Sequence, residues 1–344
     1  MKFLRKGIWP VVIATVVIGL VLMIAGVVLG ASLGVYIDNR GTHIADSSET
    51  IISEPNLGRL TDLDIDTGFS DIEFVKSDSY GLEIIYYSDS DYPEWSVENG
   101  RLKIVQGGRS FFSSYRLNFG FVSFNRNVIK VYLPDEAELD NVLLKTSSGN
   151  IRVSGFNAGY TEIHNSFGNV DVRDVSCGAF RIFLDSGDFT ADSVYADNVT
   201  VKNKFGDTLF SALNTDELSS EISSGNFTIK NSRTGALTIK NNFGNVTAEN
   251  LVSGSTNITS DSGDTDVSGE FSGKTEIFSK FGNVTLATSA SKELYSFDIS
   301  ARFGKLNFDN ERYSDNSYVK SAYVLEDDIK ISASSGDIKV IFGK

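Results

Sequence analysis

The sequence predicts an all-β protein, a single-chain β-solenoid of stacked strand–turn–strand units that follows one N-terminal transmembrane helix. Three observations carry this prediction. A glycine recurs at a fixed step of nineteen residues, apolar residues alternate with polar ones around each glycine, and an uncharged run opens the chain. A fixed short period indicates one supersecondary unit stacked on copies of itself, because a single unit cannot cover its own apolar face.

The N-terminal segment has the features of a membrane anchor. Residues 8–35 carry no charge over 28 positions, whereas about 20 suffice to span a bilayer. Basic residues precede this run and Asp38 follows it, which favours a short cytoplasmic tail at residues 1–7 and a β domain outside the cytoplasm. A cleaved signal peptide is the alternative, but its apolar region usually has only about 7–15 residues. We therefore expect a single-pass protein of the cell membrane.

Two less regular sections come next. Residues 36–56 are polar and contain Gly, Ser and Pro, which predicts a linker. Residues 57–140 alternate as strands do, for example at 82–87 and 128–134, but without the nineteen-residue step. We expect this irregular β section to cover the first regular unit, since the terminal units of a stack are atypical.

The repeats occupy residues 141–344 and end in an irregular C-terminal cap, because the last two glycine steps lengthen to 22 and 32 residues. In the regular units, the positions seven and five before the glycine and two and four after it are mainly apolar or β-branched, so we expect these four rows to face inward. Glycine followed by Asn or Asp predicts a turn. The structural turn glycines are Gly149, Gly168, Gly187, Gly206, Gly225, Gly244, Gly263 and Gly282.

The residues just before each glycine form two further rows. The immediately preceding residue alternates strictly between Ser and Phe, so in a stack each Phe is expected to lie between two Ser. One position earlier, we expect Asp185 beside Lys204 and Asp261 beside Lys280, as surface ion pairs that help to set the register.

Composition argues against several classes of function. A formal net charge of −14 disfavours binding to nucleic acid. Cys177, His43 and His164 lack the spacing of a zinc site, and the glycine-rich loop that binds phosphates is absent. Turn carboxylates such as Asp185 and Asp188 could attract Ca²⁺, but a lysine in the neighbouring unit would repel it. We therefore assign no catalytic residue, cofactor or metal.

One stretch, from Arg109 to Arg126, departs from the repeat pattern by its density of aromatic residues and arginines. These residue types are typical of binding surfaces. The alternative interpretation is a long hairpin that covers the end of the solenoid and buries its aromatic rings. The candidate partner-binding residues are Arg109, Phe111, Phe112, Tyr115, Arg116, Phe119, Phe121 and Phe124.

Three stretches carry a family resemblance. Residues 128–134 end in Leu-Pro, and residues 145–153 and 334–340 each place Ser-Gly-Asn or Ser-Gly-Asp between two strands. This pattern resembles the bacterial "putative adhesin" family of repeat-rich β-solenoid domains, over roughly residues 57–344. The resemblance implies the fold and tethering to the cell envelope. It carries over no functional residue.

These observations favour a non-enzymatic, membrane-anchored envelope protein that presents an extracytoplasmic β-solenoid for adhesion or partner binding. The partner would be an envelope protein or a wall polymer. One alternative is an envelope-stress or signalling accessory that acts on another membrane protein. The other is a polysaccharide-active solenoid enzyme, which would need carboxylates that converge on one groove.

Overall fold

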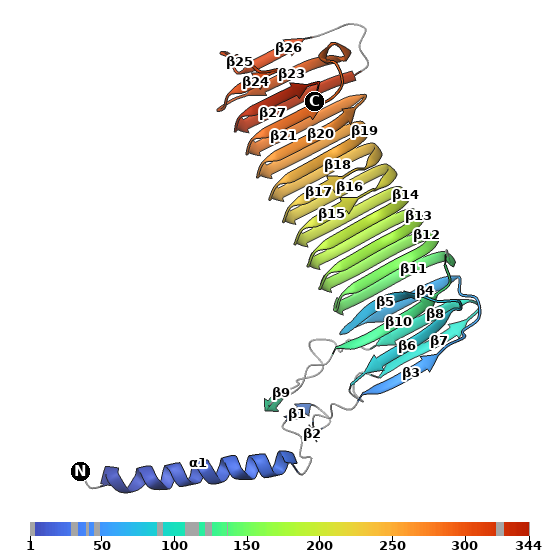
Figure 1. Ribbon diagram of the computed structural model, residues 1–344, viewed down its shortest axis with the longest axis vertical. Coiled ribbons are helices and arrows are strands. Elements are labelled where there is room, and N and C mark those ends of the chain that lie inside the picture. The colour runs from blue at the N-terminus through green and yellow to red at the C-terminus, as the bar shows by residue number, and fades with distance from the viewer. Residues whose placement is uncertain are drawn as a thin grey trace. The chain divides into compact units, whose positions relative to one another are not determined.

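A computed structural model describes residues 4–28, 34–38, 41–44, 49–87, 92–106, 117–120, 126–135, 137–320 and 327–343. The chain divides into two compact units (Figure 1). The smaller unit comprises residues 1–50, 86–92 and 109–125, and the larger unit comprises residues 51–85, 93–108 and 126–344.

The smaller unit contains one helix and one small sheet. Helix α1 runs from Leu4 to Val28. The sheet is antiparallel in the order β2-β1-β9, with bounds β1 Gly34–Asp38, β2 Gly41–Ile44 and β9 Leu117–Gly120. Within the ranges that the structure describes, no helix is both long enough and apolar enough to cross a membrane.

Two boundaries differ from those expected from the sequence. The helix expected over residues 8–35 begins at Leu4 and ends at Val28, and Val35 lies in strand β1. Val35 and Ile37 are β-branched and pair with β9, so both propensity and sheet pairing favour a strand there. The expected linker over residues 36–56 contains β2 and also β3, Thr50–Glu54.

The larger unit is a stack of coils, each coil being one circuit of the chain around a common core. Its N-terminal part contains β4 Asp62–Thr67, β5 Ser70–Lys76, β6 Gly81–Tyr86, β7 Pro93–Glu98, β8 Arg101–Gln106 and β10 Asn127–Leu133. On one side, β4 pairs in parallel with β8, and β5 pairs in parallel with β10. On the other side, both strands pair in parallel with the first regular coil. Antiparallel strands β6 and β7 then close this end of the stack.

The regular part confirms the stacked repeat fold. Each strand pairs in parallel with the strand one coil further on, at an offset of nineteen residues, as between Ile151 and Val170. The offset falls to eighteen at one irregularity, where Leu251 pairs with Gly269. Figure 1 shows these coils lying one upon another. The strands are β11 Ala137–Ser148, β12 Ile151–Phe167, β13 Val170–Ser186, β14 Phe189–Phe205, β15 Thr208–Ser211, β16 Asn214–Ser224, β17 Phe227–Lys230, β18 Arg233–Phe243, β19 Val246–Ser262, β20 Thr265–Phe271, β21 Lys274–Phe281 and β22 Val284–Thr288.

The core consists of the four rows that the sequence predicts to face inward. Every residue of these rows in the regular coils is at most 2% exposed, from Val142 in the first coil to Leu286 in the last. Side chains of adjacent rows also contact one another from coil to coil: the rings of Phe189, two residues after its glycine, and Phe210, four residues after the next glycine, meet edge to face with centroids 5.4 Å apart. Because each coil covers the apolar faces of its neighbours, burial continues along the whole stack.

The repeated glycine is required by the approach of one backbone to the next. Gly225 has φ +148°, and a Cβ atom built on it would lie 1.9 Å from the carbonyl oxygen of Gly206. No side chain fits at that distance, so the fixed step reflects close backbone stacking as well as the turn conformation.

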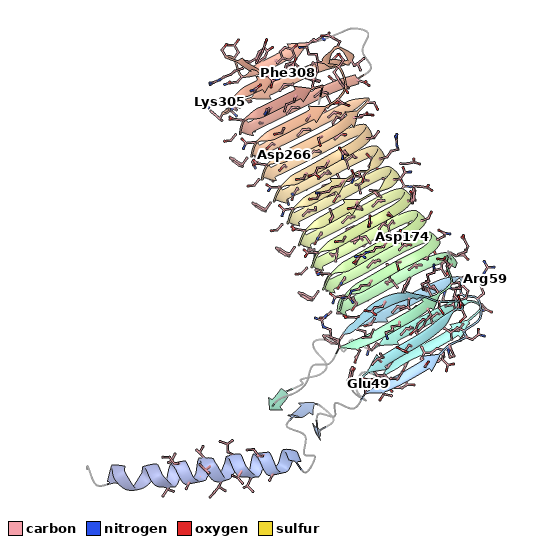
Figure 2. All side chains as sticks on the ribbon, viewed as in Figure 1. Glu49, Arg59, Asp174, Asp266, Lys305 and Phe308 are labelled. Atoms are coloured by element: carbon pink, nitrogen blue, oxygen red, sulfur yellow. The ribbon has the colours of Figure 1, made fainter. Side chains whose placement is uncertain are left out.

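A second corner lies six residues after each turn glycine from Gly149 to Gly263, where the backbone adopts positive φ values. In two of the coils this residue is Asp174 or Asn231, with φ of 51° and 50°. Figure 2 shows Lys305, which follows a turn glycine, at one lateral edge of the stack and Asp174 at the opposite edge. No single residue type marks this corner in the sequence, because Gly, Asp, Ser, Ala and Asn all occupy it.

At the C-terminal end, the order of coils in space differs from their order in the sequence. The strands here are β23 Tyr295–Ala301, β24 Leu306–Phe308, β25 Glu311–Tyr313, β26 Ser317–Lys320, β27 Asp327–Ser335 and β28 Ile338–Phe342, after a short 3₁₀ turn at Lys292–Leu294. Strand β27 pairs in parallel with both β21 and β23, and β28 with both β22 and β24. The last coil of the chain is therefore inserted, and the preceding coil, covered by antiparallel β25 and β26, ends the stack.

Candidate functional site

An exposed row of phenylalanines follows the glycine edge of the stack. The side chains that immediately precede the turn glycines point outward: Phe167 is 63% exposed, Phe205 61% and Phe243 64%. Phe69 in the β4–β5 turn and Phe303 in the outermost coil occupy the equivalent place, at 61% and 72%. Grouped exposed apolar side chains are the surface feature from which interaction sites are usually inferred, so this row is the candidate site.

The expected alternation of Phe with Ser is confirmed, and it is unbroken in space. In the sequence, Phe281 is followed by Phe303 and then by Ser335, which would break the alternation. The inserted coil places Ser335 between these two phenylalanines. The spatial order, which we call the phenylalanine row, is Phe69, Ser148, Phe167, Ser186, Phe205, Ser224, Phe243, Ser262, Phe281, Ser335 and Phe303.

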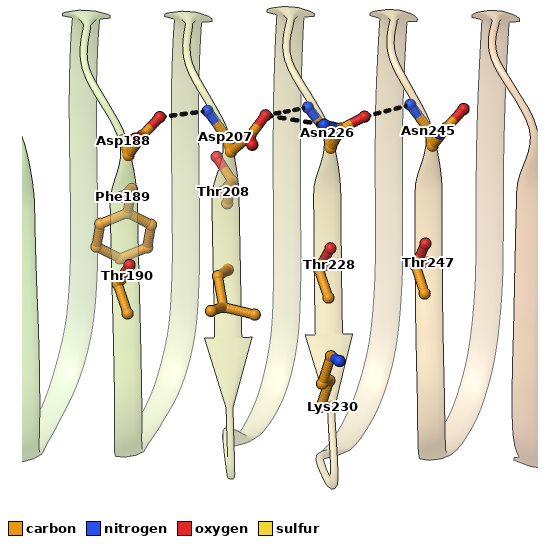
Figure 3. A pocket seen from close by; sticks show the side chains of 11 residues that line it. Asp188, Phe189, Thr190, Asp207, Thr208, Asn226, Thr228, Lys230, Asn245 and Thr247 are labelled. Carbon is orange, nitrogen blue, oxygen red and sulfur yellow. Dashed lines mark hydrogen bonds between the residues drawn. The ribbon is translucent and has the colours of Figure 1, made fainter.

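A ladder of Asn and Asp side chains fixes the backbone beside this row. The Oδ1 atom of each residue after a turn glycine accepts the backbone N–H of its counterpart in the next coil, as from Asp188 to Asp207 at 2.9 Å and from Asp207 to Asn226 at 2.8 Å (Figure 3). The ladder begins at Asp71 and ends at Lys305, whose N–H bonds to Asp337. Lysine has no acceptor for a further coil, so the ladder stops there.

Buried asparagines hold the turns that carry phenylalanine. Asn165 lies two residues before Phe167, and its Nδ2 atom donates to the carbonyl oxygens of Gly149 and Gly168, at 2.9 and 3.1 Å. Asn203 and Asn241 make the same pair of bonds in alternate coils. These bonds tie consecutive turns together, so the phenylalanines project from a preorganised edge.

Charged side chains lie beside the row, two positions before the glycines. The ion pair expected between Lys204 and Asp185 is present, at 2.7 Å between Nζ and Oδ1, with both side chains more than half exposed. The second expected pair differs: among the described residues Asp261 makes no ion pair with Lys280. The Nζ atom of Lys280 lies instead 5.9 Å from the ring centroid of Phe281, because a cation is attracted to the face of an aromatic ring.

A hollow of about 470 Å³ lies on the face that follows the glycine edge (Figure 3). Asp188 and Asp207 line it, but their Oδ1 atoms already accept backbone N–H groups of the neighbouring coils, as part of the ladder. Lys230, the basic residue of its lining, pairs with Glu249 at 3.1 Å. These groups therefore form hydrogen bonds and an ion pair between neighbouring coils. No cluster of three or more metal-ligating side chains occurs in the part of the chain that the structure describes.

The single cysteine, Cys177, is not paired with a histidine. Burial raises the pKa of the Cys177 thiol to about 12, so this group is poorly suited to act as a nucleophile. His164 pairs instead with Phe183 of the next coil, and the two rings stack with centroids 4.6 Å apart. Its Nε2 atom lies 2.8 Å from Oε1 of Glu162. The register places Ala158, not His164, beside Cys177.

The aromatic stretch singled out from the sequence lies mostly outside the described residues. This applies to Arg109, Phe111, Phe112, Tyr115, Arg116, Phe121 and Phe124. Phe119 lies in β9, where it pairs with Val35. The flanking residues Gln106 and Asn127 are in register with Thr67 and Ser70, on either side of the turn that carries Phe69.

The stacked coils and their glycine turns agree with a known family. A family model for Toastrack DUF4097 matches residues 60–250 and 184–341. The chain belongs to the Toastrack family. This membership confirms that the repeats belong to a known family of repeat domains, as the sequence indicated. A comparison with curated proteins finds no match to this Toastrack chain.

Several solved structures are similar to this Toastrack protein. One from Parabacteroides distasonis, described as a "putative lipid binding protein", is 15% identical, with a TM-score of 0.46, and the match covers 86% of this chain and 98% of that one. A "putative adhesin" from the same organism is 11% identical, with a TM-score of 0.36 and the same coverage. A "putative adhesin" from Bacteroides fragilis is 10% identical, with a TM-score of 0.34, over 86% of this chain and 99% of that one.

Proposed function

We propose that this Toastrack protein is a non-enzymatic, membrane-anchored envelope protein whose solenoid serves adhesion or partner binding through the phenylalanine row. The observation that carries the proposal is the row itself: aromatic side chains more than half exposed, repeated along one edge of a stack. Folded proteins rarely expose such a patch unless something binds to it. Aromatic anchors supply much of the free energy of binding at interfaces.

The edge is suited to binding because its geometry is set before a partner arrives. The Asn and Asp ladder and the buried asparagines connect successive turns. A surface already held in its binding conformation loses less conformational entropy on association. The uncharged segment at residues 8–35 supports an anchored location with the solenoid outside the cytoplasm.

An enzymatic function is less well supported. Acid–base cleavage of a glycan needs two carboxyl groups that flank the scissile bond. The hollow beside the glycine edge contains carboxylates, but they accept backbone N–H groups of neighbouring coils. Such bonds restrict the position of these groups and stabilise the stack.

Capture from the cell envelope tests this proposal. The full-length protein in a mild detergent would be offered envelope extract and, separately, purified wall polymer. Replacing Phe167, Phe205 and Phe243 by Ser should abolish capture, whereas Phe278→Ser, which changes an exposed phenylalanine away from the row, should not. Replacing Phe111, Phe112 and Tyr115 by Ser tests the aromatic stretch in the same assay. Capture that survives both triple replacements would refute binding by either surface.

A further inference from the structure

We propose that the occupant of the phenylalanine row is a second copy of this chain, packed antiparallel so that the rings of each copy enter the serine gaps of the other. This inference rests on the proposed function, for which it names the partner. The phenylalanines recur every second coil, which is about 9.6 Å at the usual strand spacing. A serine separates each from the next. A row that alternates bulky and small side chains is complementary to itself after a shift of one coil.

Symmetry decides the direction of pairing. A parallel two-fold pair would set each ring against the same ring of its partner, and shifting it by one coil would leave an open, non-closing contact. An antiparallel two-fold axis that passes between the coils of Ser224 and Phe243 sets five of the six rings against a serine and leaves Phe69 beyond the end of the second copy's row. In this register Phe243 faces Ser224 of the second copy, Phe205 faces Ser262, and Phe281 faces Ser186.

The charges beside the row favour the same register. An antiparallel two-fold axis makes each row face its own counterpart, so the side chains two positions before the glycines meet one another. Asp185 then faces Lys280 of the second copy, and Lys204 faces Asp261. Moving the axis by one coil towards the β3 end pairs all four charges with neutral Asn or Ser, and moving it by one coil the other way leaves only Asp185 opposite a charge, that of Arg302. Opposite charges at the rim of an interface fix its register more than they raise its affinity.

One pair of like charges is present in this register. Asp207 faces Asp264 of the second copy. The Oδ1 atom of Asp207 accepts the N–H of Asn226, and that of Asp264 accepts the N–H of Asn283, both at 2.8 Å within their own chain. These hydrogen bonds to the carboxylates reduce the cost of bringing the two groups near each other.

The area of contact is that of a modest but specific interface. The five phenylalanines that face serines, each about 60% exposed, present on the order of 600 Å² per copy, if a fully buried ring contributes roughly 150–250 Å². A standard interface buries about 800 Å² per partner, and the intervening serines and flanking charges supply further area. The chain enters each stack at the β3 end, so an antiparallel pair has its two entrances at opposite ends.

Sedimentation of the full-length protein in a mild detergent tests the pairing. Wild type should form a dimer, and Phe205→Ser with Phe243→Ser should raise its dissociation constant at least about tenfold, or about 1.4 kcal/mol. Ser224→Phe should weaken the dimer similarly, because it fills a gap that the partner's ring occupies. Phe278→Ser is the matched control and should leave the dimer intact. A monomeric wild type, or a dimer that tolerates Ser224→Phe, overturns the proposal.

The same variants separate this inference from other occupants of the row. If the row instead docks on lipid, Ser224→Phe should increase binding to vesicles of anionic phospholipid, since it adds apolar surface. If wild type is monomeric but loses envelope capture when the row is changed, the proposed function stands and only the identity of the partner is wrong. If neither dimer nor capture depends on the row, both proposals fail.

Disulfide cross-linking tests the register directly, in a Cys177→Ala background. Ser186→Cys with Phe281→Cys should give a covalent dimer under oxidation, because the two positions face each other across the pair. Within one chain they are five coils, or about 24 Å, apart, well beyond the roughly 7 Å that a disulfide tolerates between Cα atoms. Ser148→Cys with Phe281→Cys is out of register and should stay uncrosslinked. Equal yields from the two variants would exclude this register.

Discussion

Asp337 donates its backbone N–H to the Oδ1 atom of Asn283 at 3.0 Å, although 54 residues separate the two in the sequence. This bond continues the side-chain ladder from the regular coils into the last coil of the chain, which the fold inserts before the coil of Gly304. The next bond, from Lys305 N–H to Asp337 at 2.8 Å, places the Gly304 coil at the outer end. The inserted coil also keeps the alternation of Phe and Ser unbroken.

Glycine at the stacking edge should be irreplaceable. Gly225→Ala would place a Cβ atom 1.9 Å from the carbonyl oxygen of Gly206, at φ +148°. We expect it to lower the free energy of unfolding by more than about 3 kcal/mol. Gly155→Asn is the control, since Gly155 has open space around its Cβ position and Asn231 occupies the equivalent corner at φ 50°. Urea denaturation would compare them; similar losses would contradict the backbone-stacking explanation.

The ladder should depend on one oxygen of each side chain. Asp207→Asn keeps an Oδ1 acceptor for the Asn226 N–H and should change the free energy of unfolding by less than about 0.5 kcal/mol. Asp207→Ala removes the acceptor and should cost about 0.5–1.5 kcal/mol. Chemical denaturation of both variants measures the difference. If Asp207→Asn cost as much as Asp207→Ala, the negative charge rather than the hydrogen bond would stabilise the turn.

Core and surface positions of the repeat should differ sharply. Ile239 is 1% exposed, so Ile239→Ala should cost about 2–5 kcal/mol through lost burial and the cavity it leaves. Lys204 pairs with Asp185 in solvent, so Lys204→Ala should cost less than about 1 kcal/mol. Thermal unfolding of both variants decides, and equal losses would mean that the inward rows are wrongly assigned.

The buried thiol should make stability depend on pH in the alkaline range. Burial raises the pKa of Cys177 to about 12, from an ordinary value of 9.0. The folded state therefore favours the neutral thiol, so this stabilisation is fully present below about pH 9 and is lost as the pH rises towards about 12. Between about pH 7 and pH 10, wild type should lose about 1.4 kcal/mol more than Cys177→Ala. Parallel pH profiles of the two proteins would contradict this.

The same burial predicts how the thiol reacts. Native protein should react with a thiol reagent at least about a hundredfold more slowly than protein unfolded in urea, because both access and the thiolate fraction are low. Rapid labelling of the native state would show that the Cys177 strand opens readily.

The regular coils could be predicted from the sequence because one period governs both burial and register. When nineteen residues make one circuit, a residue such as Ile239 must meet its counterparts in the adjacent coils, and the alternation along each strand assigns it to the interior. The phenylalanine row was visible as alternation in the sequence, but its exposure was not. The side chain before the glycine lies at the corner, where strand alternation no longer indicates which way it points.

Where the period breaks, only the tertiary structure decides. The spacing to Gly304 and Gly336 does not reveal that the Gly336 coil lies between those of Gly282 and Gly304. The outermost coil of a parallel stack exposes unpaired backbone groups, and the antiparallel strands β25 and β26, which follow the Gly304 coil, pair with that edge. The Gly304 coil is followed in the chain by these two strands, so it ends the stack. The Gly336 coil has no such strands, and it is inserted where a coil pairs with it on each side.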